Sequence, residues 1–135
     1  MNEEKYYQKN IMIVDDDPDI VFSLQQLFES QGFTVTTADN GRNCLLELEK
    51  GFQGIIILDL MMPIMDGIET IKKMTIDGFT DQNIIIVLTA KRIQGEEFNE
   101  IYPYIADYIT KPFDISALLQ AVKKIAQRPP IKKRY

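Results

Sequence analysis

Short runs of apolar residues alternate along the chain with longer stretches in which apolar residues recur every three or four positions. Continuous apolar runs bounded by turn residues favour buried strands, and the longer spacing favours helices with one apolar face. The pattern predicts strands at Ile11–Val14, Phe33–Thr37, Ile55–Leu58, Ile84–Leu88 and Ile105–Ile109. It predicts a helix after each strand, at Pro18–Gln31, at Arg42–Lys50, from Asp66 and Gly67 onward, at Gly95–Tyr102 and at Ile115–Gln127.

The composition of the predicted strands indicates their order in a sheet. Alternation of strands and helices predicts an α/β fold with a parallel sheet. Ile11–Val14, Ile55–Leu58 and Ile84–Leu88 are wholly apolar, which is typical of strands covered by helices on both faces. The second and fifth strands contain polar residues and suit the edges. We therefore expect a doubly wound, five-stranded parallel sheet with five helices and the order 2-1-3-4-5. A ligand would bind outside the carboxyl ends of its first and third strands.

Charged and polar side chains stand where the predicted strands end. Asp15 and Asp16 follow the first strand, Asp59 the third and Thr89 the fourth, and Lys111 comes just after the fifth. Because the carboxyl ends of parallel strands meet at one edge, we expect these side chains to gather there. Mg²⁺ prefers oxygen ligands, and crowded carboxylates without a cation would raise one another's pKa. A lysine ammonium and a threonine hydroxyl suit phosphoryl oxygens, so the pattern predicts a site for Mg²⁺ and a phosphoryl group.

Length and composition restrict the function classes. A chain of 135 residues is typically one domain, and a net charge of −5 disfavours direct nucleic-acid binding as the main function. One cysteine, Cys44, allows no intrachain disulfide, and no apolar run is long enough to span a membrane. We expect a soluble cytoplasmic protein without a membrane partner. Its organisation would be a frayed N-terminal extension at 1–9, the domain at 10–127 and a basic tail or start of a linker at 128–135.

Four segments together resemble the receiver domain of two-component response regulators. They are the pair Asp15 and Asp16, and the stretches Leu58–Gly67, Leu88–Ala90 and Tyr108–Phe113. Each motif alone is modestly specific, but the four in this order and spacing are very specific, and the resemblance covers about residues 10–127. It implies a CheY-like, flavodoxin-like fold and a phosphorylation-activated signalling switch of a phosphorelay.

The resemblance implies which residues accept the phosphoryl group and hold the metal. Asp59 would be the phosphoacceptor, attacking a phosphohistidine on a sensor histidine kinase or phosphotransfer protein. Asp16 and the backbone carbonyl of Met61 would ligate Mg²⁺ together with Asp59, while Asp15 would orient a metal-bound water. The phosphorylated protein would bind a downstream protein target, as a monomer or a weak phosphorylation-dependent dimer.

The resemblance also implies how the phosphoryl group is sensed. Thr89 and Lys111 would bind phosphoryl oxygens, and Tyr108 would be an aromatic switch that turns inward when Thr89 moves. The Lys111–Pro112 peptide bond would be cis. The residues two positions beyond Asp59 and Thr89 are Met61 and Lys91. Neither is well suited to activate a hydrolytic water, so we expect a long-lived phosphorylated state.

Several positions depart from the common family pattern. Tyr104 stands where a glycine often ends the fourth helix, and Asn83 replaces a frequent proline before the fourth strand. Pro103 lacks a backbone donor, so the fourth helix is expected to end early.

Other interpretations of the same residues give different functions. A phosphatase of the haloacid dehalogenase type also places a nucleophilic aspartate at a strand end, but it requires a second aspartate where this chain has Met61. A metal-free scaffold that had lost the chemistry would not be expected to keep the four residues Asp16, Asp59, Thr89 and Lys111. We expect no enzymatic activity beyond the chain's own phosphotransfer and dephosphorylation.

Structural roles also compete with functional ones at individual positions. Isolated aspartates near helix starts, here Asp17, Asp19 and Asp66, are most often turn or helix-cap residues. Tyr108 could be an ordinary half-buried tyrosine of an edge strand, and Cys44 fits a core-facing position.

Overall fold

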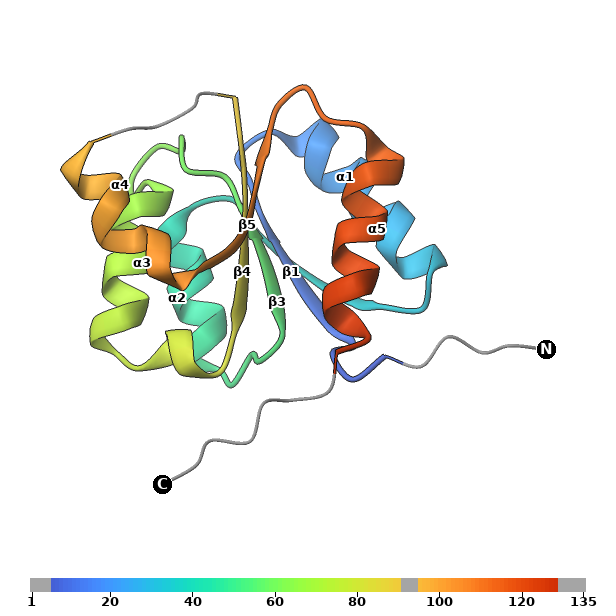
Figure 1. Ribbon diagram of the computed structural model, residues 1–135, viewed down its shortest axis with the longest axis horizontal. Helices are drawn as coiled ribbons and strands as arrows, with labels where there is room; N and C mark the ends of the chain where they lie inside the picture. Colours follow the sequence, from blue (N-terminus) through green and yellow to red (C-terminus); the bar gives the residue numbers. More distant parts are fainter. Residues whose placement is uncertain (1–5, 91–94, 129–135) are drawn as a thin grey trace.

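A five-stranded parallel sheet organises the chain in the computed structural model, which describes residues 6–90 and 95–128. The strand order is β2-β1-β3-β4-β5, which confirms the predicted order. The strands are Asn10–Val14 (β1), Thr34–Ala38 (β2), Ile55–Leu58 (β3), Ile84–Thr89 (β4) and Ile105–Thr110 (β5). The helices are Pro18–Ser30 (α1), Gly41–Glu49 (α2), Gly67–Ile76 (α3), Glu96–Ile101 (α4) and Ile115–Ala126 (α5). The helix α1 packs with α5 on one face of the sheet, and α2, α3 and α4 cover the other (Figure 1).

The sheet is buried on both faces because its central strands β1, β3 and β4 are apolar except at Asn10 and Thr89, which stand at strand ends. Met12 and Val14 of β1 face the core under α2, α3 and α4, whereas Ile11 and Ile13 face the core under α1 and α5. Cys44 of α2 lies in the first of these cores, as expected. Burial raises the pKa of its thiol to about 12, with a smaller contribution from nearby Glu47, so the thiol stays protonated and unreactive near neutral pH.

The helix ends follow local sequence signals. The side chain of Asp17 accepts a hydrogen bond from the backbone N–H of Asp19 and caps α1, and Asp66 caps α3. Both predicted caps are therefore confirmed, and Asp19 stands in the first turn of α1. The helix α4 ends at Ile101, earlier than its predicted end, and a short 3-10 turn with Pro103 at its centre follows.

Asn83 has a bridging role that the sequence did not reveal. Its side-chain oxygen accepts a hydrogen bond of 2.9 Å from the backbone N–H of Gly54, and its amide donates to the carbonyl of Phe79 at 2.9 Å. The side chain thereby joins the start of β3 to a 3-10 turn at Phe79–Asp81 that was not predicted. A proline at this position could make neither bond.

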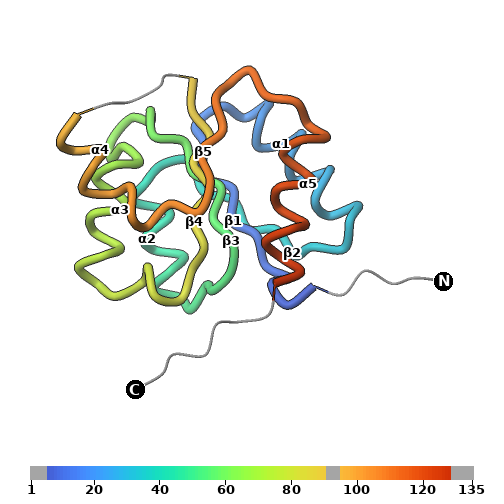
Figure 2. Tube along the Cα trace, in the orientation of Figure 1, coloured from blue at the N-terminus to red at the C-terminus, as the bar shows by residue number. Residues whose placement is uncertain are grey.

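The N-terminal segment is packed rather than frayed, at least from residue 6 onward. The backbone N–H groups of Tyr7 and Gln8 both donate to the carbonyl of Ala126, at 2.7 and 3.2 Å, at the end of α5. The ring of Tyr6 stacks on Phe33, with 4.5 Å between centroids. The trace shows this segment and the end of α5 side by side (Figure 2). The expectation of a frayed extension is therefore wrong for residues 6–9, because α5 offers an unsatisfied carbonyl.

Within residues 6–90 and 95–128, the helices are all too short or too polar to cross a bilayer.

Replacing Tyr6 by alanine should lower the free energy of unfolding by about 1–2 kcal/mol, because a half-buried aromatic ring loses its stacking and its apolar contacts. Urea unfolding at pH 7 measures the change. Tyr104→Ala, which removes a more exposed ring, should change stability by less than about 0.5 kcal/mol. Equal stability of Tyr6→Ala and the wild type would show that the segment adds nothing to the core.

Candidate functional site

Three carboxylates lie together at the carboxyl edge of the sheet. Val14 and Leu58 are paired in register between β1 and β3, and the next residues along these strands are Asp15 and Asp59. The backbone N–H of Asp59 donates to the carbonyl of Val14 at 2.9 Å, so strand pairing continues into the site. One carboxylate oxygen from each of Asp15, Asp16 and Asp59 lies within 4.8 Å of the others. The predicted gathering of these side chains is therefore observed.

Lys111 supplies the positive charge of the cluster. Its Nζ lies 2.7 Å from Oδ2 of Asp15 and 3.1 Å from Oδ2 of Asp59. The backbone N–H of Lys111 donates to the carbonyl of Thr89 at 2.7 Å, which ties the loop after β5 to the end of β4. The Lys111–Pro112 peptide bond is cis, as the resemblance implied.

The pKa values of Asp15 and Lys111 are both shifted by their surroundings in the cluster. Burial raises the pKa of the Asp15 carboxyl above its ordinary 3.8, and the hydrogen bonds from Lys111 and the backbone of Asp17 only partly offset it. For Lys111 burial acts to lower the pKa, but the hydrogen bonds and charges of Asp15 and Asp59 outweigh it and hold the pKa above 10.5.

At neutral pH the raised pKa of Asp15 and the raised pKa of Lys111 change the stability of the fold in opposite directions. A carboxyl whose pKa is raised by folding makes the folded state less stable once it ionises, and this loss develops as the pH rises from the ordinary pKa through the raised pKa. Ionised Asp15 therefore lowers the free energy of unfolding at neutral pH. The raised pKa of Lys111 stabilises the fold at every pH below 10.5, and this contribution disappears as the pH rises through the raised value. An additional cation at the cluster would offset the cost of ionised Asp15.

Thr89 presents a buried hydroxyl that has no hydrogen-bond partner among residues 6–90 and 95–128. The residue ends β4 and is fully buried. An unsatisfied buried hydroxyl costs about 1–3 kcal/mol.

The loop between β3 and α3 holds Asp59 in place from the other side. The backbone N–H of Met61 donates to Oδ1 of Asp59 at 3.0 Å, while the Met61 side chain is 49% exposed. A Cβ at Gly67 would lie 2.6 Å from the carbonyl oxygen of Asp59, so only glycine allows α3 to start this close. The sequence marked Gly67 as a helix start but did not reveal this contact. Lys91, predicted to flank the path of a hydrolytic water, lies outside the described residues.

Tyr108 occupies β5 beside the fourth helix. It is half-buried and opposite Val87 in the sheet. Its ring meets the ring of Phe98 edge to face, with 5.6 Å between centroids. Tyr108 thus connects the sheet to α4. It lies two residues before the end of β5, and Lys111 directly follows that end.

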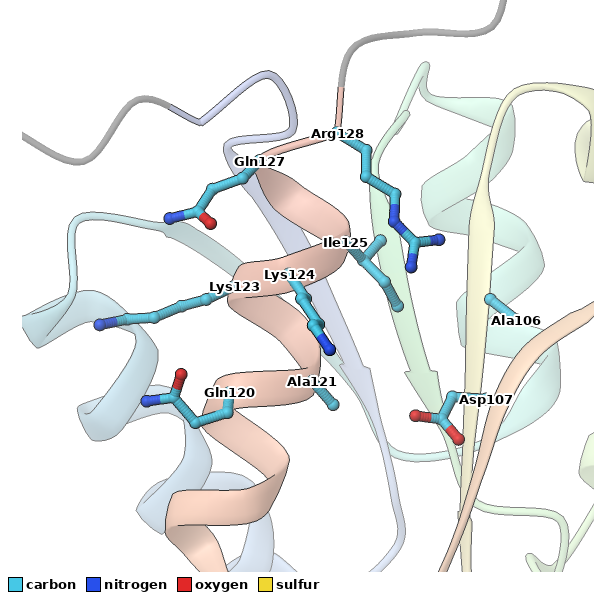
Figure 3. A pocket seen from close by; sticks show the side chains of 9 residues that line it. All are labelled: Ala106, Asp107, Gln120, Ala121, Lys123, Lys124, Ile125, Gln127 and Arg128. Atoms are coloured by element: carbon cyan, nitrogen blue, oxygen red, sulfur yellow. The ribbon is translucent and has the colours of Figure 1, made fainter.

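Two hollows differ in their relation to the cluster. One of about 510 Å³ lies between α1 and the loop after β5, and it is lined by apolar groups and by Lys111 itself. Another of about 660 Å³ lies between β5 and α5, where Lys124, Arg128 and Asp107 face the same space (Figure 3). None of the clustered carboxylates lines the second hollow, and the first touches the candidate site only through Lys111. A further hollow of about 420 Å³ is lined by Asp15 and Asp16 themselves.

The donor set fits a hard divalent cation. Three carboxylates in mutual reach, two of them buried beside one lysine, match the oxygen ligands that Mg²⁺ accepts. The fully buried hydroxyl of Thr89 and the ammonium of Lys111 offer donors for an anion next to it.

Comparisons with known proteins point to one family. The family model described as response regulator receiver domain matches residues 11–123. The alkaline phosphatase synthesis transcriptional regulatory protein PhoP of Bacillus subtilis is 36% identical over 126 residues, covering 91% of this chain and 50% of PhoP. The transcriptional regulatory protein CpxR of Escherichia coli K12 is 32% identical over 118 residues, covering 87% of this chain and 49% of CpxR. The chain thus spans about half the length of these curated relatives.

Solved structures agree with the family model. A CheY-like response regulator receiver domain protein from Methanospirillum hungatei is 36% identical with a TM-score of 0.81, covering 87% of this chain and 93% of that one. The response regulator TrrA of Thermotoga maritima, solved in complex with Mg²⁺-BeF, is 28% identical with a TM-score of 0.72, covering 87% and 98%.

Mg²⁺ should stabilise the folded chain, and removal of the Asp16 carboxylate should abolish most of that gain. A ligand that binds only the folded state adds about 2.7 kcal/mol at one hundred times its Kd. Urea unfolding at pH 7 across a Mg²⁺ titration measures the gain for wild type and Asp16→Ala. Asp19→Ala removes an acidic group outside the cluster and should keep the wild-type gain. Equal gains in wild type and Asp16→Ala would contradict a metal site here.

Proposed function

Because the chain belongs to the family of response regulator receiver domains, which are phosphorylation-activated signalling switches, we propose that Asp59 accepts the phosphoryl group. The observation that carries this proposal is the position of its carboxylate. Asp59 is 5% exposed, its Oδ2 faces Lys111, and its Oδ1 accepts from the backbone N–H of Met61. No other aspartate of the cluster is held by both a lysine and the loop after β3.

The proposed reaction transfers a phosphoryl group from a phosphohistidine of a sensor kinase or phosphotransfer protein. A carboxylate oxygen of Asp59 forms the new bond to phosphorus, the bond from phosphorus to the imidazole nitrogen breaks, and that nitrogen keeps the electron pair. Charge on the transferred group must be neutralised along the way, and Lys111 lies 3.1 Å from the attacking carboxylate. The chain would act on no phosphoryl group other than the one that it carries.

The carboxylates of Asp16 and Asp59 and the backbone carbonyl of Met61 would hold Mg²⁺, with Asp15 orienting a bound water. The cation would supply further positive charge beside the phosphoryl oxygens. Asp15 and Asp59 already share Lys111, so these two of the three acidic side chains are held in place before any cation arrives.

Thr89 would report the phosphoryl group to the surface. Its buried hydroxyl has no partner within the described part of the chain, and a phosphoryl oxygen on Asp59 would provide one. Movement of Thr89 would open space at the end of β4, and the neighbouring Tyr108 would turn into it. Because the Tyr108 ring contacts Phe98, the rearrangement would reach α4.

The face formed by α4, β5 and α5 would then carry the output. Glu96 and Glu97 open α4, whereas Lys123 and Lys124 lie in the last turn of α5. Opposite charges at the two ends of one face suit pairing of two copies about a two-fold axis, which supports a weak phosphorylation-dependent dimer. Asp107 of β5 lines the same hollow as Lys124 of α5 (Figure 3).

The output partner is proposed to be protein rather than nucleic acid. PhoP and CpxR are transcriptional regulatory proteins about twice as long as the matched region. The charge of this chain, −5, and the carboxylates at its candidate site favour a regulatory contact with protein. Cytoplasmic residence, where sensor kinases present their phosphohistidines, belongs to the same proposal.

Acetyl phosphate with Mg²⁺ should phosphorylate wild type at one residue, and Asp59→Asn should take up no phosphate, because an amide lacks the nucleophilic carboxylate. Intact-protein and peptide mass spectrometry measure the modification. Asp66→Asn, in which asparagine can still cap α3, should be phosphorylated like wild type. A phosphate adduct of undiminished yield in Asp59→Asn would assign the acceptor elsewhere.

Beryllofluoride with Mg²⁺ should shift the NMR resonances of Tyr108 and Phe98 as well as those of the acidic cluster. In Thr89→Val, which keeps the shape but lacks the hydroxyl, the distant shifts should largely disappear, since a ligand changes a conformational equilibrium only through differential contacts. Ser23→Ala serves as a matched loss of a hydroxyl on α1. Shifts confined to the acidic cluster in wild type would refute the coupling.

A further inference from the structure

Ile64 adopts a backbone conformation that isoleucine normally avoids. Its φ is +70°, and it is the one residue other than glycine with positive φ among the described residues. The backbone N–H of Met65 donates to the carbonyl of Pro63 at 2.8 Å, so Ile64 is the central residue of a left-handed γ-turn. Such turns are rare and strained, and a β-branched residue at positive φ is a genuine outlier.

The fold offers no packing that compensates for this strain. The side chain of Ile64 is 78% exposed, so it contributes little to the core. Glycine or asparagine would form the same turn more easily. Strained residues of this kind concentrate at functional sites, where the strained geometry serves binding or catalysis.

The turn is rigidly mounted. Pro63 fixes its own φ, and the carbonyl of Met65 accepts a hydrogen bond of 3.2 Å from the backbone N–H of Gly41 at the start of α2. Directly after the turn, Asp66 accepts from the backbone N–H of Glu69 and caps α3. An apolar side chain held in this way loses little conformational freedom when a partner covers it.

Ile64 also lies on the loop that follows the phosphoacceptor. This loop begins at Asp59 and leaves the sheet at the edge where the carboxyl ends of β1, β4 and β5 also lie (Figure 1). On the same loop Met61 is half exposed, and across the site Phe22 of α1 and Ile115 of α5 are 64% and 50% exposed. Exposed apolar groups therefore flank the carboxylates on more than one side.

We propose that Ile64, supported by Met61, is an anchor for the protein that delivers the phosphoryl group, inserting into an apolar surface next to its phosphohistidine. This rests on the proposed phosphorylation of Asp59. A protein donor must cover the carboxylate cluster to bring phosphorus within bonding distance of Asp59, and it thereby reaches the loop that presents Ile64. A small phosphodonor makes no such contact, and this difference isolates the role of the side chain.

The test compares a protein phosphodonor with a small one. The protein donor is the autophosphorylated sensor kinase that labels wild type fastest in a panel of purified sensor kinases, and the small donor is acetyl phosphate. Ile64→Asn keeps the left-handed turn but removes the apolar side chain, and Ile64→Val keeps an apolar, β-branched one. Ile76→Asn is the matched control, because Ile76 is equally exposed at 78% but ends α3.

Ile64→Asn should lower kcat/KM for phosphotransfer from the kinase about 10-fold or more, as expected for the loss of one buried isoleucine contact. Transfer from acetyl phosphate should stay unchanged. Ile64→Val and Ile76→Asn should behave like wild type with both donors. Ile64→Gly should raise the thermal unfolding midpoint, because it relieves the strain.

Undiminished transfer from the kinase to Ile64→Asn would overturn the inference. An equal loss of transfer to Ile64→Asn from both donors would also overturn it, since that would indicate a damaged site. Labelling of the wild type by acetyl phosphate but by no kinase of the panel would overturn it as well. Failure of acetyl phosphate to label wild-type Asp59 would instead contradict the proposed function itself.

Discussion

The structure around the candidate site depends on one electrostatic constraint: two buried carboxylates share a single lysine. Asp15 and Asp59 are almost inaccessible to water, and Lys111 contacts both. Removing a charge from water is expensive unless a partner compensates for it, and here one ammonium faces two anions. The remaining negative charge makes this edge of the sheet attractive to cations, while the ammonium makes it tolerant of an incoming phosphoryl group. Burial is the main reason why the pKa of Asp15 is raised, and the charge of Asp59 adds a smaller contribution.

The fold was predictable because the composition of each strand indicates how much of that strand is buried. The strand β3 and the part of β1 after Asn10 are apolar and buried on both faces, and the Thr residues of β2 place it at an edge. Features that depend on three-dimensional partners were not predictable. The docking of Tyr6 requires the ring of Phe33 and the end of α5, which only the folded chain brings together. The early end of α4 was foreseen because Pro103 acts locally.

The candidate site also has features that the sequence predicted and features that it did not. The gathering of Asp15, Asp16 and Asp59 follows from strand ends that meet at one edge, so the sequence pattern was sufficient. The shape of the loop after β3 was not, because hydrogen bonds and close approaches determine it. Gly67 is required by the nearby carbonyl of Asp59, and no local pattern announces a contact of that kind. The left-handed turn at Ile64 was hidden for the opposite reason, since the local preference of isoleucine argues against it.

The contact between Lys111 and Asp15 joins residues that are 96 positions apart. Domains form from the N-terminal end as chains leave the ribosome, so the acidic residues after β1 and β3 are made long before their counter-charge. Until Lys111 emerges and β5 pairs with β4, a growing chain has every carboxylate of the cluster and none of the ammonium that compensates for their burial. The cluster is therefore completed only after β5 and Lys111 have been made, and a chain that stops before Lys111 lacks the ammonium that faces Asp15 and Asp59.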